Sequence, residues 1–213
     1  MAVYDLEEQE QISELKAWWS QYGNLLVGLV LAALIASVSW QGWRLYQNRQ
    51  ADEAAAVYFE LQQAVAADDA QRTRDLAGKL ISDYSATAQA QLGVLLSAGV
   101  QFHKDEFDNA QLQLEWAATE GKDPALRDLA RLRLATVLLQ KGAVDDALAR
   151  LAPVPEGAYR VHFEDLRGDV LAAQKKPAEA RAAWQAAIDA LGDGEDAARL
   201  GMLIRAKLES LEG

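Results

Sequence analysis

Cysteine is absent from this chain of 213 residues. Its absence excludes disulfides, thiolate catalysis and metal sites built from cysteine. Only four prolines occur. Because proline interrupts helices, its scarcity, together with the abundance of alanine after residue 50, favours helix throughout. The chain also lacks a basic patch and carries a net charge of −11. An acidic chain repels phosphate backbones, so we expect no binding to nucleic acid.

Recognisable catalytic and metal-binding patterns are missing as well. The two histidines, His103 and His162, lie far apart, and no zinc-protease, phosphate-loop or serine-hydrolase motif occurs. Paired acids such as Asp145 and Asp146 stand at expected helix starts, where the helix dipole favours negative charge. We therefore expect a protein that is not an enzyme and that holds no metal ion or cofactor.

One long uncharged stretch is present. No charge occurs in residues 17–43, and nine of the positions 25–43 are leucine, isoleucine or valine. As a helix, residues 25–43 would rise about 28 Å, close to the hydrocarbon thickness of a bilayer. Aromatic residues flank the stretch, as they do at membrane interfaces: Trp18, Trp19, Tyr22, Trp40, Trp43 and Tyr46. This pattern predicts one transmembrane helix.

Two other interpretations of the stretch remain open. A helix buried in a soluble core would rarely be uncharged over this length. A cleaved signal peptide would need a basic start and a shorter apolar run, whereas residues 1–16 hold five acidic residues and one lysine. Ser37-Val38-Ser39 could still pass for a cleavage site. An uncleaved anchor is the better interpretation.

The anchor divides the chain into a short acidic tail of residues 1–24, the transmembrane helix of residues 25–43 and a domain of residues 44–213. Gly28, Ala32 and Ala36 share one face of the helix, and small residues at this spacing let a second membrane helix pack closely. Lys and Arg residues near the two ends of the span are almost equal in number, so the charge rule does not orient the chain.

No glycine or proline interrupts residues 43–77, so the helix can continue out of the membrane. Residues 51–67 and 74–84 are expected to form a helical hairpin. Asp123-Pro124 and Pro177 have the residue types that begin helices. Pro153, Pro155 and Gly157 are expected to end a helix of residues 143–151. Residues 195–211 are expected to form a last helix, with Leu200, Leu203, Ile204 and Leu208 on one side, that caps the domain.

An internal repeat carries the prediction of the fold. Small residues recur 12 positions apart in three places: Ala98 with Ala110, Ala135 with Ala147, and Gly168 with Ala180. Four residues after each second position lie Leu114, Leu151 and Trp184. The repeats begin 37 and then 33 residues apart, close to the 34 of the tetratricopeptide repeat. The sequence predicts an all-α fold in which a solenoid of helical hairpins follows the transmembrane helix, with these positions in the repeat core.

The order of parts resembles the YfgM-type ancillary subunits of the bacterial Sec translocon. The resemblance covers essentially the whole chain and is carried by several stretches: Glu10-Gln11 to Lys16 with aromatics before Gly23, Gly42-Trp43-Arg44, Leu132 to Ala135, Asp165 to Asp169, and Ala180 to Trp184. It implies a single-pass type II protein of the inner membrane with its C-terminal domain in the periplasm. It also implies partnership with the translocon channel and with a membrane-anchored periplasmic chaperone of the PpiD type.

The role implied by the resemblance is a non-enzymatic scaffold that passes newly exported client proteins to periplasmic chaperones. An anchored scaffold that faces the cytoplasm and binds a soluble stress-response regulator stays open as an alternative. Asp165, Arg167 and Asp169 are charged and close together. They are expected either to pair along the helix surface or to contact a partner.

Overall fold

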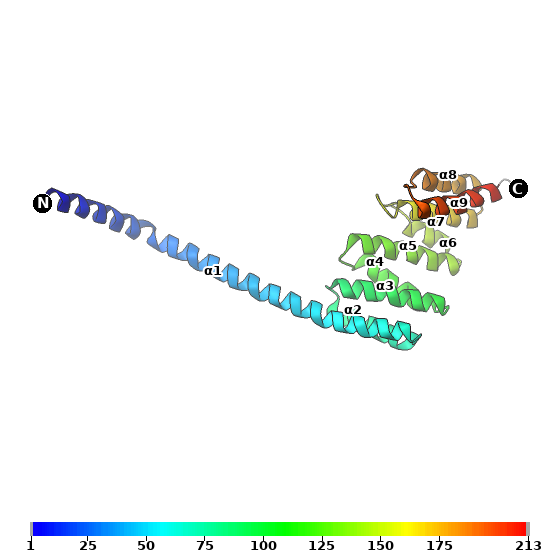
Figure 1. Cartoon of the computed structure of the whole chain (residues 1–213), viewed down its shortest axis with the longest axis horizontal. Coiled ribbons are helices and arrows are strands. Elements are labelled where there is room, and N and C mark those ends of the chain that lie inside the picture. The colour runs from blue at the N-terminus through cyan, green and yellow to red at the C-terminus, as the bar shows by residue number, and fades with distance from the viewer. Residues whose placement is uncertain (1, 212–213) are drawn as a thin grey trace. The chain divides into compact units, whose positions relative to one another are not determined.

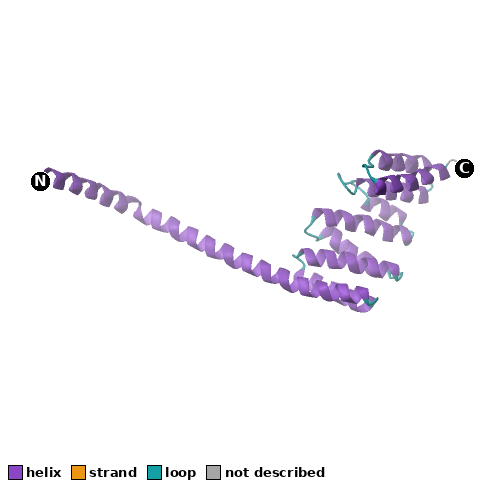
Figure 2. Ribbon diagram, viewed as in Figure 1, coloured by secondary structure: helices purple, strands orange, loops and turns teal. Residues whose placement is uncertain are grey.

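The computed structural model describes residues 2–211, with side chains from residue 11 onward. The chain divides into two compact units, Met1–Arg49 and Gln50–Gly213. Within residues 2–211 every regular element is an α-helix, as Figure 2 shows. The predicted all-α fold is therefore confirmed.

The helix α1, Ala2–Ala66, runs without a break and contributes residues to both units. All nine leucine, isoleucine and valine side chains of residues 25–43 are exposed, Leu25 by 68% and Val38 by 69%. A core helix of a soluble protein would bury such side chains. Residues 11–66 include one segment long and apolar enough to cross a membrane, so this helix fits the predicted anchor.

The second unit is a stack of helical hairpins (Figure 1). In the first hairpin, the end of α1 packs with α2, Ala70–Tyr84. In the second, α3, Ala88–His103, packs with α4, Phe107–Thr119. In the third, α5, Pro124–Gln140, packs with α6, Val144–Arg150, and in the fourth, α7, Arg160–Ala173, packs with α8, Pro177–Asp189. A last helix, α9, Glu195–Ser210, packs on α8. In the terms used below, α1, α3, α5 and α7 are the first helices of the hairpins.

One residue with positive φ lies in the turn of each hairpin: Asp68, Asp105, Gly142 and Lys175. In each turn the next residue donates its backbone N–H to a carbonyl five residues back, for example Glu106 to Gln101 at 2.9 Å. This bond and the left-handed residue together satisfy the free carbonyls at the end of the first helix. The four turns therefore share one geometry.

The spacing of these turns reveals a fourth repeat that the alanine pattern does not show. Asp68 lies 37 residues before Asp105, the same interval as from Asp105 to Gly142. Moving back by 37 residues places Leu61 where the later hairpins have Ala98, and Thr73 where they have Ala110. Both Leu61 and Thr73 are fully buried. The first hairpin thus follows the repeat with other side chains.

Capping side chains set several helix starts. Asp69 accepts the N–H of Arg72 at 3.0 Å, Thr87 accepts that of Ala90 at 3.2 Å, and Asp123 accepts that of Ala125 at 2.8 Å. Because Asp69 caps α2, this helix begins at Ala70, four residues before the start expected at residue 74. Pro124 and Pro177 occupy first-turn positions of α5 and α8, as predicted.

Three clusters of buried side chains follow one another along the stack, centred on α1 to α3, on α3 to α7, and on α7 to α9. The last helix contributes Ile204, which is fully buried, with Leu200 and Leu208 packed beside it. Leu203, expected on the same side, is instead 59% exposed. Because it directly precedes the buried Ile204, it lies about 100° away around the helix.

Candidate functional site

The residues predicted for membrane contact lie on the surface of α1. Gly28, Ala32 and Ala36 are exposed. A Cβ atom built at Gly28 would meet nothing within 4 Å. The six flanking aromatic side chains are between 44% and 68% exposed. The rings of Trp18 and Tyr22 lie 5.8 Å apart, and those of Trp43 and Tyr46 lie 6.2 Å apart. Within the described residues these side chains remain available to lipid or to another helix.

The small residues of the repeat lie inside the second unit. The buried positions, each no more than 1% exposed, are Ala98, Ala110, Ala135, Ala147 and Ala180. Gly168 is also buried. A Cβ at Gly168 would lie 2.3 Å from Cδ1 of Trp184, a distance too short for any real contact. Glycine is therefore required there because the indole of Trp184, which is 4% exposed, packs against the backbone of α7.

Two of the three candidate contact residues have partners inside the domain. Nζ of Lys207 in α9 donates to the carboxylates of Asp165 at 2.7 Å and Asp169 at 2.8 Å. The indole N–H of Trp184 donates to the backbone carbonyl of Asp165 at 3.1 Å and to the Asp169 carboxylate at 3.2 Å. Asp165, Asp169, Trp184 and Lys207 thus join α7, α8 and α9, and we call them the Lys207 cluster.

Partial burial affects the titration of this cluster. Burial raises the pKa of Asp165 above 3.8, because the loss of water outweighs the opposing hydrogen bond and charge of Lys207. For Lys207, burial acts to lower the pKa, but the hydrogen bonds and charges of Asp165 and Asp169 outweigh it. The pKa of Lys207 is therefore raised above 10.5. Lys207 stays charged throughout the neutral range.

Arg167, the third candidate, is exposed and pairs with Glu164, whose carboxylate lies 3.5 Å from Nη1. The side chain of Arg167 is 46% exposed. The structure thus separates the three candidates, because Asp165 and Asp169 contribute to the Lys207 cluster whereas Arg167 lies at the surface. Contact of Arg167 with a partner stays a prediction.

Several buried polar contacts were not visible in the sequence. Gln91, 1% exposed, donates to the carbonyl oxygens of Ala117 at 3.3 Å and Asp123 at 3.2 Å, and accepts the N–H of Asp123 at 3.0 Å. Gln101, fully buried, accepts from Nε of Arg74 at 3.3 Å and donates to the carbonyl of Ala70 at 3.1 Å. Each glutamine joins segments more than 25 residues apart. Glutamine is rarely buried, so residue type gave no signal.

Arginine side chains also fasten α5 to its neighbours. Nη2 of Arg131 donates to the carbonyl of Pro153 at 2.6 Å, Nε donates to that of Arg150 at 3.2 Å, and the guanidinium lies 5.1 Å from the ring centre of Phe163. Nη1 of Arg133 donates to the carbonyl of Leu95 in α3 at 2.9 Å. These bonds fix the loop after α6 and the spacing between two first helices.

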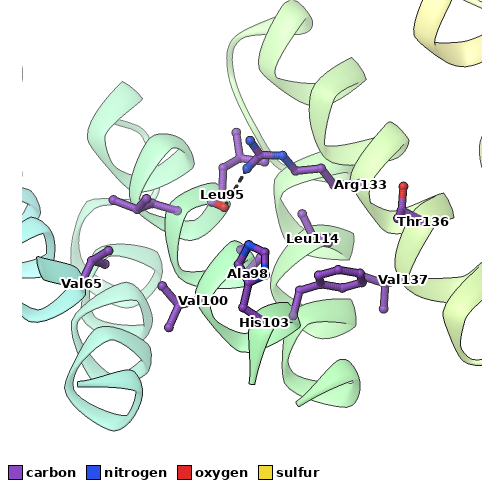
Figure 3. A pocket seen from close by; sticks show the side chains of 12 residues that line it. Val65, Leu95, Ala98, Val100, His103, Leu114, Arg133, Thr136 and Val137 are labelled. Carbon is purple, nitrogen blue, oxygen red and sulfur yellow. Dashed lines mark hydrogen bonds between the residues drawn. The ribbon is translucent and has the colours of Figure 1, made fainter. Parts of the chain in front are cut away.

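A pocket of about 470 Å³ lies along the first helices α1, α3 and α5, with Leu114 of α4 contributing to its lining. Figure 3 shows Val65 and Val100 on one side, Thr136 and Val137 on the other, and the bond from Arg133 to Leu95. The other lining residues are Leu96, Ala98, Gly99, Phe102, His103 and Leu114. We call this the α3–α5 pocket.

Within residues 11–211 no group of three or more histidine, aspartate or glutamate side chains is arranged to hold a metal ion. His103 lies on the wall of the α3–α5 pocket, and His162 lies near the start of α7. Their separation leaves them without a shared site. In the described part of the chain, the features best suited to interaction are the exposed span and the α3–α5 pocket.

The sequence of this chain is similar to a known domain family and to several named proteins. The model of a family described as a tetratricopeptide repeat-like domain matches residues 16–213. A Neisseria gonorrhoeae protein named "Ancillary SecYEG translocon subunit" is 31% identical over 212 residues, covering 97% of this chain and 98% of its own length.

Two further proteins carry the same name. That of Escherichia coli K12 is 29% identical over 198 residues, with 88% of this chain and 90% of its own length covered. That of Haemophilus influenzae is 27% identical over 185 residues, with 87% and 90% covered. No solved structure matches this chain significantly.

Proposed function

The chain belongs to the family of ancillary SecYEG translocon subunits, and we propose that it is a non-enzymatic scaffold, anchored in the inner membrane beside the translocon, that passes newly exported proteins to periplasmic chaperones. One observation carries most weight. The helix that exposes the uncharged residues 25–43 continues as α1 into the first hairpin of the repeat domain. Such a chain holds a binding domain close to whatever else is anchored nearby.

Tethering supports a role in handing over clients. Two anchored molecules meet at a high effective concentration, so weak contacts between them suffice. We propose that the partners include the translocon channel, a membrane-anchored chaperone of the PpiD type and the exported clients. We further propose that Gly28, Ala32 and Ala36 form the face on which a membrane helix of one partner packs. Their small side chains permit a close approach of backbones.

The anchor is tested by membrane extraction. The protein should stay in the membrane fraction after alkaline carbonate treatment, and release by carbonate alone would contradict the anchor. Leu31→Arg should weaken insertion by about 2.5–3.5 kcal/mol, because it places a charge near the centre of the span. Leu31→Val is the matched control and should leave the fractionation unchanged.

Copurification tests the partnership. After mild solubilisation, the intact protein should bring down the translocon channel and a membrane-anchored chaperone. Replacing residues 25–43 with an unrelated transmembrane helix should reduce this recovery. Unchanged recovery would show that the small-residue face does not contribute. Absence of both partners from the wild-type preparation would remove the basis for the scaffold.

The orientation is tested with a single introduced cysteine, which is unique because the chain contains none. Asp146→Cys places it at an exposed position in the first helical turn of α6. In cells with a permeabilised outer membrane, an impermeant maleimide should label this residue without lysis. Labelling only after lysis would instead support a domain in the cytoplasm that binds a soluble stress-response regulator.

A further inference from the structure

We propose that the α3–α5 pocket receives a large apolar side chain of an extended client polypeptide, and that Arg133 at the pocket binds an acidic residue next to it. The inference rests on the proposed function, because it names the kind of client segment that the domain holds. Its basis is the lining of the pocket, the position of Gly99 and the distribution of charge.

The lining is mostly apolar and only partly covered. Val65, Leu96, Val100 and Phe102 are partly exposed, while Leu95, Leu114 and Val137 are buried behind them. Binding becomes more favourable when an apolar side chain of a ligand covers such partly exposed apolar side chains and removes their surface from water. The volume of about 470 Å³ falls within the range of sites that hold ligands.

Gly99 lies in the wall of this pocket and has no packing reason to be glycine. It is in the interior of α3, where glycine is less favourable for a helix than alanine. A Cβ built there would meet nothing within 4 Å. Glycine at this position instead leaves the backbone of α3 open to the pocket, as expected where another chain approaches closely.

The charge of the pocket is opposite in sign to that of the domain. Its lining includes Arg133 and His103 but no acidic residue, whereas the part of the chain after Trp43 has 20 basic and 27 acidic residues. Three other hollows near α8 and α9 each include an acidic residue: Glu209, Asp196 and Asp193. These hollows also contain arginines, so the α3–α5 pocket differs from them in having a basic residue and no acidic residue in its lining.

Arg133 is held in place for this contact. Its Nη1 donates to the carbonyl of Leu95, which fixes the guanidinium beside the pocket (Figure 3). A guanidinium has five N–H donors, so others remain to bind a carboxylate while Nη1 keeps its bond. Charge-assisted bonds of this kind are stronger than neutral ones. An apolar side chain with a neighbouring Asp or Glu is thus the complementary ligand.

The test uses full-length protein in nanodiscs and a fluorescein-labelled peptide, Ser-Gly-Leu-Phe-Asp-Gly-Ser, followed by anisotropy. Replacing Asp by Lys in the peptide should weaken binding about tenfold. The variant Arg133→Gln should remove the preference for Asp: the Asp peptide should bind more weakly than to wild type, and the Lys peptide at least as well as to wild type. Arg72→Gln, which removes the same charge from an exposed site on α2, is the matched control and should behave as wild type.

A second variant tests the pocket itself. Gly99→Leu extends an apolar side chain into the open space and should weaken both peptides at least tenfold, with an unchanged helical spectrum. Equal binding of the Asp and Lys peptides by the wild type would overturn the role of Arg133. Wild-type binding by Gly99→Leu would overturn the pocket. Displacement of the peptide by decanoate at a much lower concentration would indicate a fatty-acid site and overturn the polypeptide ligand.

Failure of this inference differs from failure of the proposed function. Gly99→Leu and Arg133→Gln should still copurify with the translocon channel, because the anchor is unchanged. Copurification without peptide binding would overturn the pocket alone. Peptide binding without copurification would overturn the scaffold beside the translocon and leave the pocket as a peptide site.

Discussion

Gly99 and Gly168 lie at adjacent positions of the repeat on two first helices, and their surroundings differ completely. At Gly168 a Cβ would lie 2.3 Å from the ring of Trp184, whereas at Gly99 it would meet nothing within 4 Å. The first glycine leaves a pocket open between α3 and α5, and the second lets a tryptophan close the space between α7 and α8. Glycine therefore leaves empty space beside α3, whereas beside α7 it makes room for the tryptophan that fills the space.

The fourth helix pair, α7 with α8, is also held together by charged groups. Asp169 occupies the repeat position that corresponds to Gly99 and Thr136, and both it and Asp165 bind Lys207 of α9. In α3, on the wall of the α3–α5 pocket, the residue at that position is Gly99, which has no side chain. Hydrogen bonds and ion pairs thus join α7, α8 and α9, whereas a pocket stays open between α3 and α5, where we propose that a ligand binds.

The largest expected effect on stability comes from adding a methyl group at Gly168, between α7 and Trp184. Gly168→Ala should destabilise the protein by about 3 kcal/mol, because the added methyl displaces the buried indole of Trp184 and its two hydrogen bonds. Chemical denaturation followed by the fluorescence of tryptophan measures the change. A neutral result would mean that Trp184 moves freely and that the two glycines do not differ.

The hairpin of α5 and α6 provides the next largest effect. Ala147 of α6 is fully buried, and Ala147→Leu should destabilise the domain by about 2 kcal/mol through overpacking. Asp146→Ala, at the exposed neighbouring position, should change stability by less than about 0.5 kcal/mol. Thermal unfolding of both variants measures the difference, and equal shifts would show that the register of the repeat is wrong.

Lys207→Met should have a smaller effect, about 1 kcal/mol, because it leaves two partly buried carboxylates without their cation. Since the pKa of Lys207 is raised in the folded state, its contribution is fully present below pH 10.5 and is lost as the pH rises through the folded pKa. Wild type should therefore lose stability above pH 10.5, and Lys207→Met should lose less.

Hydrogen exchange locates the effect of Lys207→Met. Amides of α9 should exchange faster in this variant, while those of α3 should be unchanged. Faster exchange throughout the domain would mean that the Lys207 cluster does not act locally, and the contrast between a fixed end and an open pocket would fail.

The smallest effect should have the opposite sign. Gly99→Ala should stabilise the protein by about 0.4–1 kcal/mol, because alanine favours helix and its methyl enters open space. Thermal unfolding measures the gain. Destabilisation would show that the site is less open than the structure indicates, and the difference between Gly99 and Gly168 would disappear.

The helical class, the apolar span and the repeat of the last three hairpins could all be predicted from the sequence. Each depends on local signals: the uncharged residues 25–43, the spacing of alanines such as Ala110 and Ala147, and the capping residues at Asp123-Pro124. These signals act within one or two helical turns, or recur at a fixed interval. They can therefore be read along the chain without knowing its path in space.

Which polar groups meet, and which space between helices stays open, depends on how the helices pack and could not be predicted. Lys207 reaches Asp165 across 42 positions of the sequence, and Gln91 reaches the backbone of Asp123 across 32. The first hairpin belongs to the repeat although Leu61 and Thr73 replace the small residues of the others. Whether a glycine such as Gly99 or Gly168 faces a pocket or a tryptophan depends on the side chains of neighbouring helices. Their distances are fixed only when the hairpins pack against one another.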